Sequence, residues 1–178
     1  METLEIPPFN RLQDYFGAWA IEPNAMQLLA EMARKTDLVK HIADAKPPSI
    51  RSDVQIVKAE NAKQVAVVKL TGSLMKSASS MSSGTSTIQA RREIRQAVAS
   101  PDVSSILLAI DSPGGTVSGT ADLSAEILQA RKSKPVYAFI DDLGASAAYW
   151  LASQCEKIFA NNLTALVGSI GTIAVAYD

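Results

Sequence analysis

The sequence predicts an α/β fold with a mostly parallel sheet, because short apolar strands alternate with helices along its second half. The strand patterns lie at 64–70, 104–110, 135–140 and 156–160, and the helical patterns at 88–99, 117–132 and 145–153. Further apolar turns and strands are expected up to residue 177. Alternation of this kind favours right-handed crossovers between parallel strands.

Composition limits the classes of function. The 178 residues suffice for one domain with a real core, and the net charge of −1 gives no electrostatic reason to expect a nucleic-acid partner. The single cysteine, Cys155, excludes an internal disulfide and is expected to be a small buried residue in a reduced compartment. No cofactor and no metal are expected.

The termini bear on localisation. The N-terminus lacks the basic start and apolar stretch of a signal peptide. The apolar segment Leu163–Tyr177 is short and contains Gly168 and Gly171, so no membrane span is expected. We therefore predict a cytoplasmic protein.

Three segments are expected along the chain. Residues 1–45 are interpreted as an N-terminal helical arm, with one helix beginning at Pro23 and a shorter amphipathic helix before it that contains Leu12, Tyr15, Phe16 and Trp19. The arm either packs on its own domain or serves in oligomerisation or docking. Residues 46–63 are expected to be a linker, and residues 64–178 to form the main domain.

Two turn motifs carry the chemistry. Asp111–Gly115 and Gly144–Ala148 each follow a predicted strand. In a parallel sheet such turns lie side by side where ligands bind. The first turn can offer backbone N–H groups to an oxyanion, and the second can present Ser146 at a helix start. An ordinary glycine turn and a serine N-cap are the alternative interpretations.

A nucleophilic serine needs a base. The only histidine, His41, lies in the arm, which disfavours a Ser-His-Asp triad. A lysine with lowered pKa is the other option, and Lys76 and Lys157 are the candidates, although each is more typical of a solvated surface residue. Asp141 and Asp142 are interpreted as strand-end or capping residues.

Together these residues resemble the signal peptide peptidase A family of serine proteases, and above all its soluble branch with phage head-maturation proteases. The resemblance covers about residues 64–178 and is carried by Val67–Gly72, Ile110–Gly115, Gly144–Trp150 and Gly168–Gly171. It implies a ClpP/crotonase-like fold of stacked βαβ units. It also implies that Ser146 is the nucleophile and that the backbone N–H groups of Gly114 and Ala147 bind the oxyanion.

The resemblance extends to supporting residues. Gly115 would keep the first turn open, and Ser169 would orient a catalytic lysine. The Ser-rich loop at 73–86 is expected to be mobile and to help hold an extended peptide. Its start and the residue before it, Gly72, Ser73, Leu74 and Met75, are therefore the predicted substrate-binding residues.

In this family the lysine base follows the serine at a distance that places it past Asp178, so we expect a version of the protease that is truncated before its base. The leading prediction is a serine endopeptidase of the Ser-Lys type, with a protein or peptide substrate and a homo-oligomeric assembly. The alternatives are an inactive scaffold or capsid-assembly homologue and a crotonase-like acyl-CoA enzyme. The latter needs a carboxylate and a nucleotide pocket, for which the sequence has no clear signal.

Overall fold

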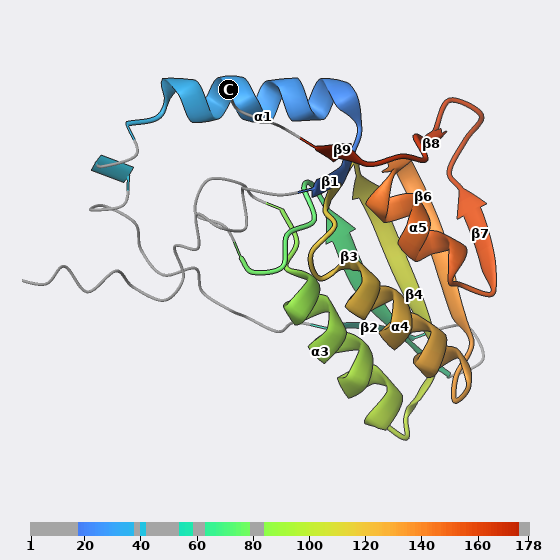
Figure 1. Cartoon of the computed structure of the whole chain (residues 1–178). Coiled ribbons are helices and arrows are strands. Elements are labelled where there is room, and N and C mark those ends of the chain that lie inside the picture. Colours follow the sequence, from blue (N-terminus) through green and yellow to red (C-terminus); the bar gives the residue numbers. More distant parts are fainter. Residues whose placement is uncertain (1–17, 38–39, 42–53, 59–62, 79–83, 175–178) are drawn as a thin grey trace, which may run out of the picture.

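The computed structural model describes residues 18–37, 40–41, 54–58, 63–78 and 84–174, and it has two sheets. The larger sheet has the strand order β2-β3-β4-β6-β7, with β8 also beside β6 (Figure 1). Its strands are β2 Gln55–Lys58, β3 Gln64–Thr71, β4 Val103–Ser112, β6 Val136–Ala145, β7 Lys157–Ala160 and β8 Leu166–Gly168. Every pairing in it is parallel except β2 with β3, which confirms the predicted α/β class.

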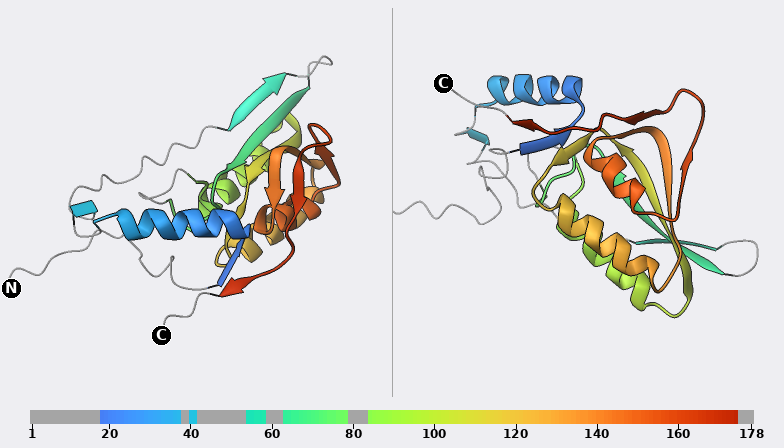
Figure 2. Two further views of the ribbon diagram at one scale, coloured as in Figure 1. Left: turned by 90° about the horizontal axis from the view of Figure 1, so that it is seen from above. Right: turned by 45° about the vertical axis from the view of Figure 1, so that its right-hand side comes forward.

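Three helices connect these strands. They are α3 Thr87–Ala99, α4 Thr120–Arg131 and α5 Ala147–Ser153. Figures 1 and 2 show α3 and α4 side by side on one face of the sheet. Ala90, Ile94 and Ala97 recur at helical spacing and form the buried side of α3. The central strands alternate in burial, so every second residue of β4 reaches one core.

The smaller sheet was not predicted. It has the order β5-β1-β9, formed by β5 Gly114–Thr116, β1 Ala18–Ile21 and β9 Ile173–Ala174. Strand β1 is antiparallel to both neighbours. Residues 18–21, expected in a helical arm, therefore pair with the Gly-Gly motif of the main domain.

The N-terminal prediction needs correction at its first helix. Trp19 lies on a strand and is only 5% exposed, whereas the other residues assigned to that helix, Leu12, Tyr15 and Phe16, lie outside the described residues. The second helix is confirmed as α1 Pro23–Lys35. Pro23 explains the boundary, because proline favours extended backbone before it and starts a helix well. The Glu22 carboxylate then caps α1 by accepting from Ala25 N–H at 2.9 Å.

Two connecting segments are more ordered than expected. The predicted linker contains β2, in which Ile56 pairs with Ala66, while most of its other residues lie outside the described part. The start of the predicted mobile loop is fixed as well. Leu74 is fully buried, and its N–H and C=O bond to Gly114 and Thr116 at 2.8 Å each. The prediction of mobility is therefore wrong for this stretch, and residues 79–83 lie outside the described ones.

Two smaller expectations concern burial and membrane spans. Cys155 is buried, which confirms the prediction of a small buried residue, and this burial raises the pKa of its thiol to about 12. Among the described residues no helix is long and apolar enough to cross a membrane. The domain boundaries at residues 45 and 63 remain predictions.

Candidate active site

Ser146 stands at the turn from β6 into α5, with φ 53° and ψ −115°. Positive φ is unfavourable for a residue with a Cβ, so this backbone is strained. Its N–H donates to Gly168 O at 2.7 Å, which holds the turn against the end of β8. The side chain makes no capping hydrogen bond to α5. An ordinary serine N-cap has extended backbone and a capping hydroxyl, so the structure argues against that alternative.

Small residues around Ser146 let the turn pack into the core. A Cβ on Gly144 would lie 2.7 Å from Ile140 Cδ1. Ala147 and Ala148 are fully buried at the start of α5. Larger side chains would push α5 away from the sheet, so the run of small residues is required by packing at this turn.

The residue Ser146 is 6% exposed, and it lines a pocket. Its Oγ donates to Gly171 O at 3.2 Å, the one hydrogen bond of this hydroxyl among the described residues. The pocket has a volume of about 370 Å³. Besides Ser146 it is lined by Ala20, Val117, Tyr149, Trp150, Ser153, Ile170, Gly171 and Thr172. The serine therefore opens onto a mainly apolar space to which no described residue contributes a carboxylate.

Sequence reasoning assigned no role to these lining residues. Tyr149 and Trp150 could have been found, because they follow Ser146 by three and four residues and so share its side of a helix. Ala20 and Val117 come from distant segments that meet through the pairing of β1 with β5. No local pattern signals that pairing.

The two turn motifs lie together as predicted. Ser112 pairs with Gly144 across β4 and β6. A Cβ on Gly114 would lie 2.2 Å from Ala20 O and 3.0 Å from Ala147 N, and Gly114 has φ 100°. Only glycine satisfies both the close approach and the backbone angle. Gly114 is thus in contact with the first residue of α5.

The first turn differs from the prediction in its details. It leads into β5 before α4 begins, and Gly114 N–H donates to Ser112 Oγ at 3.1 Å, so the predicted oxyanion donor is already engaged. Gly115 admits Leu74 rather than a ligand, because a Cβ there would lie 1.8 Å from Leu74 O.

Ser112 was missed. It is fully buried and also donates to Gly72 O at 2.6 Å, so one hydroxyl joins the ends of β3 and β5.

The predicted substrate-binding residues lie elsewhere. Gly72 N–H donates to Asp111 O at 2.9 Å, and Ser73, Leu74 and Met75 are buried. Leu74 bridges to Gly115 on the edge of β5 opposite to β1. None of the four residues lines the pocket.

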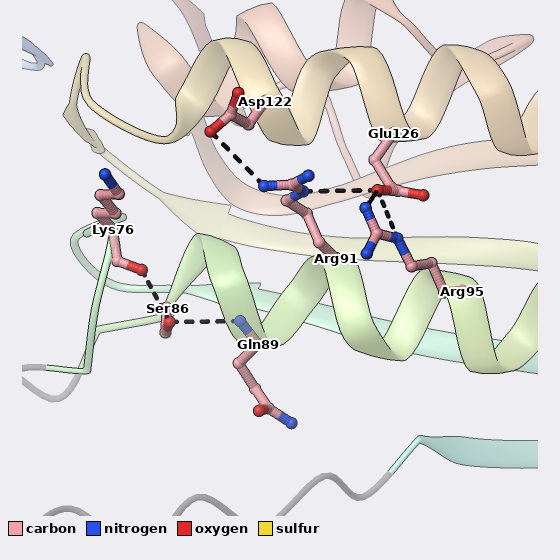
Figure 3. A network of polar contacts seen from close by, with 7 residues as sticks. All are labelled: Lys76, Ser86, Gln89, Arg91, Arg95, Asp122 and Glu126. Atoms are coloured by element: carbon pink, nitrogen blue, oxygen red, sulfur yellow. Dashed lines mark hydrogen bonds and ion pairs between the residues drawn. The ribbon is translucent and has the colours of Figure 1, made fainter.

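The two candidate lysines are not brought to Ser146. Lys157 pairs with Tyr137 at the start of β6, and Ser146 follows the other end of that strand. Ser146 follows Tyr137 by nine residues, and at about 3.3 Å per residue this separation is roughly 30 Å, well beyond the reach of a lysine. Lys76 lies beside the start of α3, where its carbonyl accepts from Ser86 Oγ at 3.0 Å (Figure 3). Neither lysine lines the pocket.

The remaining titratable candidates also lie apart from the pocket. His41 lies in the short described segment 40–41 that follows α1 in the sequence, and it does not line the pocket. Asp141 accepts from Asn161 Nδ2 at 2.9 Å, and Asp142 is exposed on β6. Ser169 is exposed with φ 51°, next to the Gly168 carbonyl that holds Ser146. The described part of the chain therefore contributes a serine and a pocket, with no base in contact with the hydroxyl.

A strained serine at a strand-to-helix turn of a parallel sheet, beside a glycine turn, is the arrangement of α/β hydrolytic enzymes. Comparison with known proteins shows which family a segment of the chain is similar to. Residues 129–178 match the model of Peptidase family S49. The resemblance to the signal peptide peptidase A family and its phage protease branch is thereby confirmed.

Two curated relatives illustrate the match. The chain is 41% identical over 80 residues to the head-tail preconnector protein GP5 of Enterobacteria phage P21, covering 45% of this chain and 16% of the relative. It is 32% identical over 117 residues to the chloroplastic serine protease SPPA of Arabidopsis thaliana. This match covers 64% of this chain and 17% of the relative. The chain thus spans about a sixth of the length of these relatives.

A solved structure described as an enoyl-CoA hydratase/isomerase family member superposes with a TM-score of 0.43 and 18% identity, covering 60% of this chain and 46% of that one. A likeness at this level adds nothing to the fold described above.

Proposed function

We propose that this chain carries the nucleophile of a serine endopeptidase and that Ser146 is that nucleophile. The observation that supports this role best is the conformation of Ser146. Ser146 has positive φ, caps no helix and lines a mainly apolar pocket, and its hydroxyl makes one hydrogen bond among the described residues, at 3.2 Å to Gly171 O. The match of residues 129–178 to Peptidase family S49 supports peptide hydrolysis as the class of reaction.

In this mechanism Ser146 Oγ attacks the carbonyl carbon of a peptide bond while its proton passes to a base. The tetrahedral intermediate expels the amine, which takes that proton, and water then hydrolyses the acyl-enzyme. Ala147 N–H is the first oxyanion donor, because the first N–H of a helix has no intrahelical acceptor. Gly114 N–H becomes the second donor once it leaves Ser112 Oγ, its present acceptor.

The base in this proposal is a lysine outside the described residues. It would have to replace Gly171 O as the partner of the Ser146 hydroxyl. Ser169 lies next to the segment that contacts Ser146 and would orient the lysine amine. A protein or peptide is the substrate, and a homo-oligomer is the proposed assembly.

Intact mass after incubation with a fluorophosphonate tests this function. We expect one adduct on the parent chain if an activating base is present, and none on Ser146→Ala. Ser124→Ala is the matched control, because Ser124 is also 6% exposed but lies on α4, and it should retain the adduct. An adduct that persists in Ser146→Ala contradicts the proposal. The proposal is also contradicted if no form of the protein gives an adduct, including a longer chain with further lysines.

An inactive assembly component is the second candidate, since none of the described residues places a base on Ser146 Oγ. The phage relative described as a head-tail preconnector protein is in line with that role. No labelling of Ser146, together with an oligomer in light scattering that dissociates on deletion of residues 1–45, would favour it. The acyl-CoA alternative has less support, because no carboxylate lines the pocket. Tight binding of a CoA thioester would revive it.

A further inference from the structure

Strand β1 occupies the edge of β5 that faces Ser146. Ala20 pairs with Gly115, and Ile21 pairs with Gly114. Hydrogen bonds extend this pairing beyond both ends of β5, from Val117 N–H to Ala18 O at 3.0 Å and from Glu22 N–H to Pro113 O at 2.8 Å. On its other side β1 pairs with β9, so an extended segment is enclosed between two strands (Figure 1).

This strand passes directly in front of the reactive groups. Ala20 lines the same pocket as Ser146. Its carbonyl oxygen lies 2.2 Å from the position of a Cβ on Gly114, and Ala147 N lies 3.0 Å from that same position. The Ala20 carbonyl oxygen and the nitrogen of the proposed oxyanion donor Ala147 therefore lie close to the same point. A peptide substrate needs its own carbonyl in this neighbourhood.

The side chains of β1 are held by a small cluster of their own. Trp19 and Ile21 pack with Met75, whereas Ala20 belongs to the main core. The residues completing this small cluster are Ala25, Met26 and Leu29 of α1. Thus β1 and α1 are anchored together, and local opening of this unit would expose β5 while withdrawing only Ala20 from the main core.

We propose that β5 and β9 form a binding site for an extended apolar peptide and that residues 18–21 are its resident occupant. The inference rests on the proposed peptidase function and adds what fills the site at rest. A ligand pairs antiparallel with Gly114–Thr116, as added strands do in other peptide-binding proteins. It has a small residue where Ala20 stands and bulky apolar residues where Trp19 and Ile21 stand. Such a ligand binds only when β1 has left.

Binding of a labelled peptide tests this without catalysis. The probe is a fluorescein-tagged peptide with the sequence of residues 17–23, and the protein carries Ser146→Ala so that nothing is cleaved. Adding Trp19→Ala weakens the anchor of β1, while the peptide still supplies the tryptophan. We expect anisotropy to show binding about tenfold tighter or more than without this change. A scrambled peptide should not bind.

Ile94→Ala is the matched control, because it removes a buried side chain of α3 and leaves β1 intact. Equal affinity in the Trp19→Ala and Ile94→Ala proteins would overturn the proposal, and so would the absence of peptide binding to Trp19→Ala. Circular dichroism checks folding. If Trp19→Ala does not fold, it is replaced by Leu29→Ala, which weakens the same cluster from the side of α1. Equal affinity in Leu29→Ala and Ile94→Ala, or no peptide binding to Leu29→Ala, would then overturn the proposal.

A crosslink gives a second, internal comparison. Ala18→Cys and Val117→Cys, added to the Trp19→Ala protein, face each other across β1 and β5. Cys155 stays out of this chemistry because it is buried and its thiol pKa is raised to about 12. We expect the oxidised form to exclude the peptide and the reduced form to bind it. Equal binding by both forms would refute the proposal. The peptidase function is judged separately, because only the absence of fluorophosphonate labelling in a protein that keeps Ser146 would refute it.

Discussion

The two strand-to-helix connections at the site are built in opposite ways. The connection after β4 runs through β5 to α4, and its polar groups have partners. Ser112 Oγ bonds to Gly72 O and Gly114 N–H, and Gly114 O accepts from Leu74 N–H. The connection after β6 passes through Ser146 alone, with strained backbone and no side-chain cap on α5.

This difference distinguishes a turn that supports the site from a turn that takes part in the proposed reaction. A turn whose donors and acceptors are paired holds strands in register but has little left for a ligand. The Ser146 turn pairs its own N–H with Gly168 O and its hydroxyl with Gly171 O, but it retains backbone strain and an uncapped helix start, whose first N–H groups are available for a ligand. The glycine motif therefore supports the site at rest, and the Ser146 turn is the part to which the proposed function assigns the reaction. Four predictions test this distinction, from the largest effect to the smallest.

The largest effect is expected at Gly115 in the supporting turn. In Gly115→Ala the new methyl group would lie 1.8 Å from Leu74 O, a backbone atom that cannot move aside cheaply. We expect the free energy of unfolding to fall by about 3 kcal/mol or more, measured by urea denaturation. Gly171→Ala, where a Cβ meets nothing within 4 Å, should change it by less than about 0.5 kcal/mol. Similar values for the two variants would show that β5 is not held tightly.

Ser112→Ala tests the hydroxyl that joins the strand ends. It leaves Gly114 N–H and Gly72 O without their present partner inside the protein. We expect a loss of about 2 kcal/mol in the free energy of unfolding, because buried unpaired groups are costly. Ser105→Ala is the control on the same strand, where the half-buried residue should tolerate the change. A loss no larger than that of the control would contradict a supporting role for Ser112.

Substitution of Ser146 measures the strain of the reactive turn. Both Ser146→Ala and Ser146→Gly remove the hydroxyl, but only alanine keeps a Cβ at φ 53°. We expect the glycine variant to be more stable than the alanine variant by about 1 kcal/mol, since glycine adopts positive φ without a steric cost. Glycine normally destabilises strands and helices relative to alanine. Thermal unfolding that gives the normal order would mean that the turn is not strained.

The smallest effect is expected where α4 is attached to α3. Glu126 accepts from Arg95 Nε at 2.8 Å, and Arg91 approaches both Glu126 and Asp122 at 3.5 Å (Figure 3). The hydrogen bond from Arg95 is the main cause that lowers the pKa of Glu126. The pair therefore stabilises the fold at pH values above the ordinary glutamate pKa, and the effect is lost as pH falls through the lowered one.

We accordingly expect Glu126→Gln to lower Tm slightly at pH 7 and to match the parent in strong acid. The change is small because solvent screens the pair. Asp122→Asn is the control, since its carboxylate is 60% exposed and contacts only Arg91. A Tm difference that does not depend on pH would show that Glu126 acts through packing and not through its charge.

Local patterns predicted much of the main domain correctly. Apolar runs and helical spacing identified β3, β4, β6, β7, α3 and α5, because burial of one face imposes a period on the residues themselves. The position of Ser146 between a strand and a helix followed from the same patterns. So did the meeting of the two turn motifs, since parallel strands end at one edge of a sheet.

The sequence by itself thus determined the class of fold, the location of Ser146 and its resemblance to a peptidase family. The tertiary structure decided what surrounds that serine. Pairing of β1 with β5 joins segments almost a hundred residues apart, and Ser112 finds its acceptor on Gly72 of another strand. Lys157 is kept away by the register of β7 on β6. Strand pairing and side-chain packing depend on distant residues, and no periodicity within one segment encodes which distant partner it will meet.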